Sequence, residues 1–95
     1  MLSNDEWTQK DYLEEIKNGT KVLLIDIINK GINGVDTVLY NPYILKKEDT
    51  ETIFLFYCDT GKVSKERLIE FKNKFPAHEV KSLRGGRSYW NKYLN

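Results

Sequence analysis

Two nearly unbroken apolar runs constrain the fold of this chain more than any other feature of its sequence. Residues 22–28 and residues 52–57 are apolar almost throughout, whereas a strand with one face in water would alternate apolar and polar side chains. Continuous runs rich in β-branched and aromatic residues are typical of strands buried on both faces of a parallel sheet. The sequence therefore predicts an α/β fold: a small, mostly parallel β-sheet with right-handed crossovers, flanked by helices on both faces.

Capping residues and helix breakers mark where the predicted helices begin and end. Thr8, followed by Asp11, predicts the start of a helix that ends near Gly19. Ser64 is expected to be the N-cap of a second helix, which ends before Pro76. The remaining expected elements are short strands over residues 38–40 and 80–83 and a final helix whose apolar side is Tyr89, Trp90, Tyr93 and Leu94.

Composition limits the class of protein and its partners. The chain has 95 residues, 40% hydrophobic and 31% charged, so one domain over residues 1–95 is expected. Lys and Arg number 15 against 14 Asp and Glu, which disfavours a nucleic-acid partner. No apolar run is long enough to cross a membrane, and residues 1–6 are polar and acidic, unlike a secretory signal. A cytoplasmic protein without a membrane partner is therefore expected.

The lone cysteine, Cys58, is the candidate for chemical reactivity. One cysteine can form neither an internal disulfide nor a cysteine-rich zinc site. Cys58 directly follows the apolar run 52–57, and ligands of parallel sheets bind beyond the carboxyl ends of the strands. The polar loop after it contains Gly61 and leads into a helix, so backbone N–H groups can stabilise a thiolate there. An inert, buried cysteine is the alternative, but this setting favours a reactive thiol.

A resemblance to the rhodanese-like family rests on two motifs and one tryptophan. The motifs are Cys58-Asp59-Thr60-Gly61-Lys62-Val63-Ser64 and Leu83-Arg84-Gly85-Gly86, and the tryptophan is Trp90. With the capped helix and the strand around Asp26, the similar stretches cover most of residues 7–95. The resemblance implies a sulfurtransferase in which Cys58 takes a sulfane sulfur from a donor, holds it as a persulfide and passes it to a nucleophilic acceptor. It implies no metal and no organic cofactor. It assigns substrate or anion binding to the loop residues Asp59, Thr60, Gly61, Lys62, Val63 and Ser64.

Two positions in this loop depart from many single-domain rhodaneses. Asp59 and Val63 stand where those proteins carry arginines. We expect Asp59 to raise the pKa of the thiol and to repel thiosulfate, which leaves Lys62 as the cation of the loop and Arg84 as a contributor at the same rim. The sequence therefore favours a protein persulfide donor, such as a cysteine desulfurase, over thiosulfate. The acceptor, the pathway and the oligomeric state stay open.

The same loop is also compatible with a function other than sulfur transfer. A catalytically weak or inactive rhodanese-like module could use loop 58–64 to bind a partner or an anion. Phosphatase chemistry is disfavoured, because the Cys-x5-Arg motif would need an arginine at Ser64. Asp26 is expected to hydrogen-bond a neighbouring loop and not to act in catalysis. His78 is expected near the opposite edge of the sheet from Cys58, out of reach as a general base.

Overall fold

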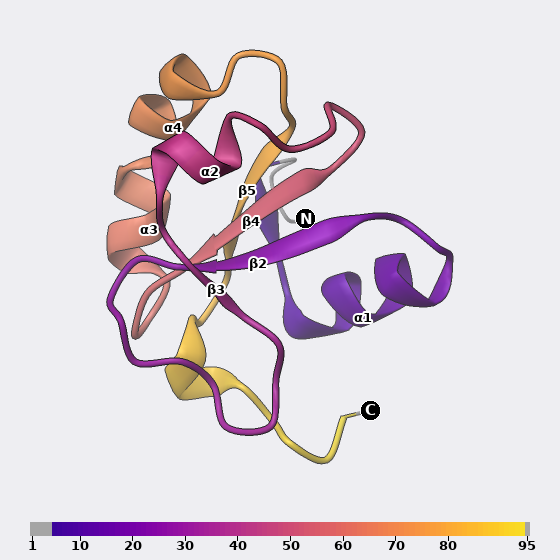
Figure 1. Cartoon of the computed structure of the whole chain (residues 1–95). Coiled ribbons are helices and arrows are strands. Elements are labelled where there is room, and N and C mark those ends of the chain that lie inside the picture. Colours follow the sequence, from indigo (N-terminus) through magenta and orange to yellow (C-terminus); the bar gives the residue numbers. More distant parts are fainter. Residues whose placement is uncertain (1–4, 95) are drawn as a thin grey trace.

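A wholly parallel sheet of five strands forms the centre of the computed structural model, which describes residues 5–94 (Figure 1). The strands lie in the order β1-β5-β4-β2-β3, so that β4 occupies the middle. The predicted α/β class is confirmed. Residues 1–4, which belong to the polar opening segment, and residue 95 lie outside the described part. The strands are β1 (Glu6–Trp7), β2 (Val22–Asp26), β3 (Val38–Leu39), β4 (Ile53–Tyr57) and β5 (Val80–Leu83).

The central strands β2 and β4 correspond to the two apolar runs. They pair in parallel, and the register sets Asp26 opposite Tyr57. β2 ends at Asp26 and does not extend to residue 28 as expected. The reason is that the Asp26 carboxylate accepts the backbone N–H groups of Ile28 and Asn29, each at 2.8 Å, which turns the chain out of the sheet.

Helices cover both faces of the sheet, as predicted. Figure 1 shows α1 on one side of the sheet and α2, α3 and α4 on the other. The start of α1 is confirmed, because Thr8 Oγ1 accepts the Asp11 N–H at 3.1 Å and the Thr8 N–H donates to Asp11 Oδ2 at 2.9 Å. Within residues 5–94, no helix combines the length and the apolar character that crossing a membrane requires. The elements are α1 (Gln9–Lys17), α2 (Pro42–Leu45), α3 (Lys62–Glu66), α4 (Leu68–Lys74) and the 3-10 turn η1 (Arg87–Tyr89).

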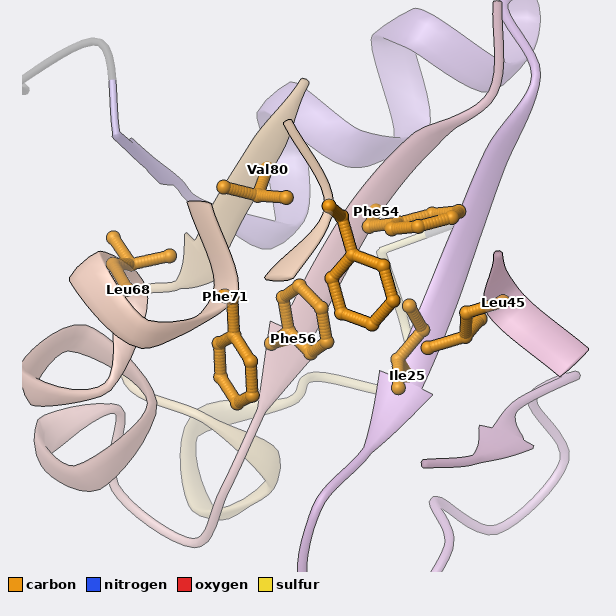
Figure 2. Close-up of a cluster of buried hydrophobic side chains, with 8 residues drawn as sticks. Ile25, Leu45, Phe54, Phe56, Leu68, Phe71 and Val80 are labelled. Carbon is orange, nitrogen blue, oxygen red and sulfur yellow. The ribbon is translucent and has the colours of Figure 1, made fainter. Parts of the chain in front are cut away.

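The core has two layers because successive side chains of β4 point to opposite faces. Phe54 and Phe56 face the layer that contains α4, where the Phe56 ring stacks on Phe71 with ring centroids 3.9 Å apart (Figure 2). Leu55 and Tyr57 point to the other face, on which α1 lies. Both sets are fully buried, which accounts for the unbroken apolar run. The second layer also contains Leu24, Leu83, Trp7, Tyr12 and Trp90.

The prediction of a final helix near the C-terminal end is wrong. In the described part of the chain only the short turn η1 forms there, and Tyr89 and Tyr93 are 79% and 83% exposed. Trp90 alone of the three aromatics packs inward, with its ring centroid 5.9 Å from that of Tyr12. The Gln9 side chain binds both backbone groups of Asn91, donating to its carbonyl and accepting from its N–H, each at 2.7 Å. Those bonds occupy the groups that a helix would use.

Candidate functional site

Cys58 directly follows β4 and lies at the carboxyl edge of the sheet. It is 2% exposed, and its Sγ accepts the backbone N–H of Gly61 at 3.2 Å and that of Ser64 at 3.4 Å. The thiol also lies 3.6 Å from Ser64 Oγ, to which it can donate. Residues 59–64 therefore wrap round the sulfur with N–H groups directed at it, which is an arrangement that stabilises negative charge on sulfur.

Two glycines allow this loop to close on the turn after β5. Gly61 has φ +90°, and a Cβ there would lie 2.8 Å from the backbone nitrogen of Gly85. Gly86 also packs on the loop, and a Cβ there would lie 2.7 Å from the carbonyl carbon of Asp59. The N–H of Arg87 donates to the Cys58 carbonyl at 2.9 Å and holds the two segments together. The Gly-Gly turn is thus one wall of the cysteine loop.

The predicted cap at Ser64 is wrong. α3 begins at Lys62 after Gly61, whose left-handed conformation starts the helix without a side-chain cap. Ser64 lies inside α3, fully buried, and its hydroxyl oxygen is 2.6 Å from that of Ser82 on β5. The hydroxyl also donates to the Gly61 carbonyl at 3.3 Å. Sequence reasoning missed Ser82, although a serine next to Leu83 in the predicted strand 80–83 was a signal.

The thiol of Cys58 has a lowered pKa. Burial acts to raise this pKa, but hydrogen bonds from the backbone N–H and the hydroxyl of Ser64, and from the N–H groups of Gly61 and Thr60, lower it by more. The net direction is opposite to the one expected from Asp59. The thiolate is therefore easier to form here than in an ordinary cysteine, despite the burial.

Asp59 is paired with two cations that the sequence analysis did not single out. Its carboxylate lies 3.4 Å from Lys30 Nζ and 3.7 Å from Arg87 Nη1. Arg87 Nε also donates to the carbonyl of Gly31 at 3.0 Å, which fixes the guanidinium between the two loops. Lys30 and Arg87 are far from the cysteine in sequence and carry no motif, so only the fold could bring them beside the loop. Both cations oppose the negative charge of Asp59, although the pairs are partly exposed to solvent.

The other predicted site residues are distributed round the loop. Thr60 and Lys62 are exposed, and Val63 is 47% exposed. Arg84 is exposed just after β5, where it lines a groove together with Thr60. It therefore shares the rim with the cysteine loop, while Arg87 is the arginine that contacts Asp59.

Asp26 makes structural hydrogen bonds and His78 lies away from Cys58, as expected. The Asp26 carboxylate accepts the N–H groups of Ile28, Asn29, Lys30 and Gly31 at 2.7–2.9 Å, which confirms its bonding to a neighbouring loop. Burial acts to raise the pKa of Asp26, but these bonds lower it on balance.

His78 stacks on Phe54 and contacts the carbonyls of Glu48 and Asp49 at the opposite edge from Cys58. Among residues 5–94 no cluster of three or more His, Cys, Asp and Glu side chains could hold a metal ion.

Comparison with known proteins extends the evidence for the fold. No family model matches the chain, and no curated protein matches it. The crystal structure of the BH2092 protein from Bacillus halodurans is similar to it, with a TM-score of 0.57 and 19% sequence identity. The alignment covers 90% of this chain and 69% of that one. At this identity the similarity concerns the fold.

Proposed function

We propose that this chain is a cytoplasmic rhodanese-like sulfurtransferase in which Cys58 carries a sulfane sulfur as a persulfide. The observation that carries the proposal is the position of Cys58 Sγ at the end of β4, where it accepts the N–H groups of Gly61 and Ser64 at 3.2 and 3.4 Å. Those donors stabilise a thiolate before transfer and an anionic persulfide after it. The same loop carries the sequence resemblance.

The transfer consists of two displacements at sulfur. The Cys58 thiolate attacks the outer sulfur of a donor persulfide or thiosulfate and forms a new S–S bond. The S–S bond of the donor breaks, and the donor leaves as a thiolate or as sulfite with the electron pair. A nucleophilic acceptor then attacks the outer sulfur on Cys58, and the Cys58 thiolate is regenerated. Both steps use the lowered pKa of the thiol, because the attacking and leaving group is the thiolate.

A protein persulfide is the donor that the site favours over thiosulfate. Asp59 follows Cys58 in the chain and pairs with Lys30 and Arg87, so these cations are not free to bind a dianion. Lys62 and Arg84 remain exposed at the rim. Docking of a protein donor would place its persulfide over the loop through contacts elsewhere on the surface, and it would not depend on cations inside the loop.

One observation favours a second function, a binding module without sulfur transfer. Cys58 is 2% exposed, and the Lys30–Asp59–Arg87 cluster ties together the segments beside it. In that case loop 58–64 would bind a partner or an anion, and Cys58→Ser would leave this binding intact.

Intact-mass spectrometry distinguishes the two functions. Wild type and Cys58→Ala are incubated separately with thiosulfate, mercaptopyruvate, a polysulfide and a persulfidated cysteine desulfurase, before and after treatment with cyanide or reductant. Gain of one labile sulfur by wild type alone supports transfer through Cys58. If none of these donors loads the protein while a known sulfurtransferase is loaded in parallel, the binding module is the better description.

A further inference from the structure

A groove beside the cysteine loop has no part in the chemistry described above. It lies between the start of α1 and the segment after β5, and its volume is about 580 Å³. Thr60 of the cysteine loop forms part of its wall, so we call it the Thr60 groove. Cys58 itself does not line it. Its lining includes Lys10, Thr60, Arg84, Tyr89 and Trp90.

Aromatic side chains form an apolar wall of the Thr60 groove. Tyr89 is 79% exposed, yet its ring is backed by the chain, because a Cβ on Gly85 would lie 2.8 Å from Tyr89 Cγ. Trp90 is half-buried against Tyr12 and also lines the groove. Leu94, which is 47% exposed, adds aliphatic surface. Exposed aromatics supported in this way bind apolar side chains at little entropic cost.

Two cations give the groove a positive charge. Lys10 and Arg84 both line it, both are exposed, and the structure pairs neither with a carboxylate among residues 5–94. Lys62, two residues after Thr60 in the chain, is also exposed. No Asp or Glu is among the described residues that line the groove, so nothing in its wall offsets the charge of Lys10 and Arg84. A partner for the groove must therefore be negative.

We propose that the Thr60 groove binds an acidic peptide segment of the protein that delivers sulfur to Cys58. Carboxylates of the segment bind Lys10 and Arg84, and an apolar side chain packs on Tyr89 and Trp90. This inference rests on the proposed function. The groove touches the loop at Thr60 but does not include Cys58, so a ligand held there does not react. It anchors a larger molecule whose persulfide approaches the sulfur, and this is why a peptide fits better than a small donor.

The test uses a short, capped, fluorescently labelled peptide in which glutamates flank a single leucine. Its Kd is measured by fluorescence anisotropy at low salt for wild type and for Lys10→Glu/Arg84→Glu. The matched control is Lys46→Glu/Lys47→Glu, which reverses two exposed lysines in the turn after α2. We expect about tenfold weaker binding for the groove variant and no change for the control. Binding to wild type should also weaken as salt increases.

A second variant and a neutral peptide check the apolar contact and the charge. Tyr89→Ala removes an exposed ring without disturbing the core and should weaken binding, and the glutamine version of the peptide should bind weakly to every variant. Amide NMR shifts should change near Lys10, Thr60 and Arg84.

Three results would overturn the proposal. They are no binding of the acidic peptide to wild type, equal binding to the groove variant, and tighter binding of a single-stranded oligonucleotide at the same residues. Loading of wild type by polysulfide is measured separately. If the peptide binds in the groove while Cys58 takes up no sulfur, the docking site stands and the proposed function fails.

Discussion

The hydroxyl oxygens of Ser64 and Ser82 lie 2.6 Å apart, and both residues are fully buried. Ser64 belongs to α3 and Ser82 to β5, so this contact joins the helix after the cysteine loop to the sheet. Ser64 Oγ also lies 3.6 Å from Cys58 Sγ. When the thiol ionises, the Ser64 hydroxyl can turn and donate to the thiolate, and the Ser82 hydroxyl can then donate to Ser64. A chain of two hydroxyl groups thus supports the charged sulfur.

Replacement of Ser64 by alanine should raise the pKa of Cys58. The variant loses the hydroxyl that bonds the sulfur, while the backbone N–H groups of Gly61 and residue 64 remain. Ser82→Ala should raise the pKa in the same direction but by less, because it acts through Ser64. Ultraviolet absorbance of the thiolate, followed against pH, measures the change. Ser88→Ala, at an exposed serine, is the control. An unchanged or lower pKa in Ser64→Ala would show that the hydroxyl does not stabilise the thiolate.

Gly86→Ala should destabilise the protein and reduce sulfur loading of Cys58. The new Cβ would lie 2.7 Å from the Asp59 carbonyl carbon, which must move, and φ at this position is +58°. Gly34→Ala is the matched control, because φ there is +77° but nothing lies within 4 Å of the added Cβ. We expect a loss of about 1 kcal/mol in the free energy of unfolding for Gly34→Ala and about 3 kcal/mol or more for Gly86→Ala. Denaturant unfolding measures both, and equal losses would mean that the Gly-Gly turn does not support the cysteine loop.

The central sheet could be predicted because the apolar character of its residues indicates directly that they are buried. Phe54 and Leu55 face different layers, and a run that is apolar at both positions can only be buried on both faces. The position of Cys58 follows from the end of that run. The cap at Thr8 was also predictable, since both partners lie within one turn of helix. The cap at Thr8 depends on contacts within one helical turn, and the burial of the central strand is implied by its continuous apolar run.

What the sequence did not reveal depends on contacts between distant segments. Ser64 carries the side chain of a typical cap, but Gly61 starts the helix one turn earlier because the loop must close round Cys58. The expected C-terminal helix is lost to two hydrogen bonds between Gln9 and Asn91, residues that are 82 positions apart. Such competition between a local preference and a tertiary contact cannot be read from periodicity.

Asp26→Asn should reduce stability most at neutral pH. The carboxylate accepts four backbone N–H groups, and an amide cannot accept from all of them because its NH₂ group is itself a donor. We expect a loss of about 3 kcal/mol in the free energy of unfolding. The pKa of Asp26 is lowered in the folded state, so its contribution is complete above the ordinary carboxyl pKa and is lost as the pH falls through the lowered value. The difference from wild type, measured by denaturant unfolding, should therefore shrink below about pH 4. Asp36→Asn, at an exposed aspartate, should cost little at any pH, and a loss for Asp26→Asn that does not depend on pH would contradict this account.

Asp59→Asn should accelerate sulfur uptake from thiosulfate. The substitution removes a negative charge from the residue after Cys58 and releases Lys30 and Arg87, which then attract the dianion. The lost ion pairs are surface pairs and should change stability by less than about 1 kcal/mol. We expect loading, followed by intact mass, to become about threefold to tenfold faster at low salt, with the gain shrinking as salt is added. Asp49→Asn is the matched control, because Asp49 is paired with Lys21 at the other end of the sheet, and its loading rate should equal that of wild type. Equal or slower loading of Asp59→Asn would mean that Asp59 does not limit the approach of an anionic donor, and the preference for a protein donor would lose its electrostatic basis.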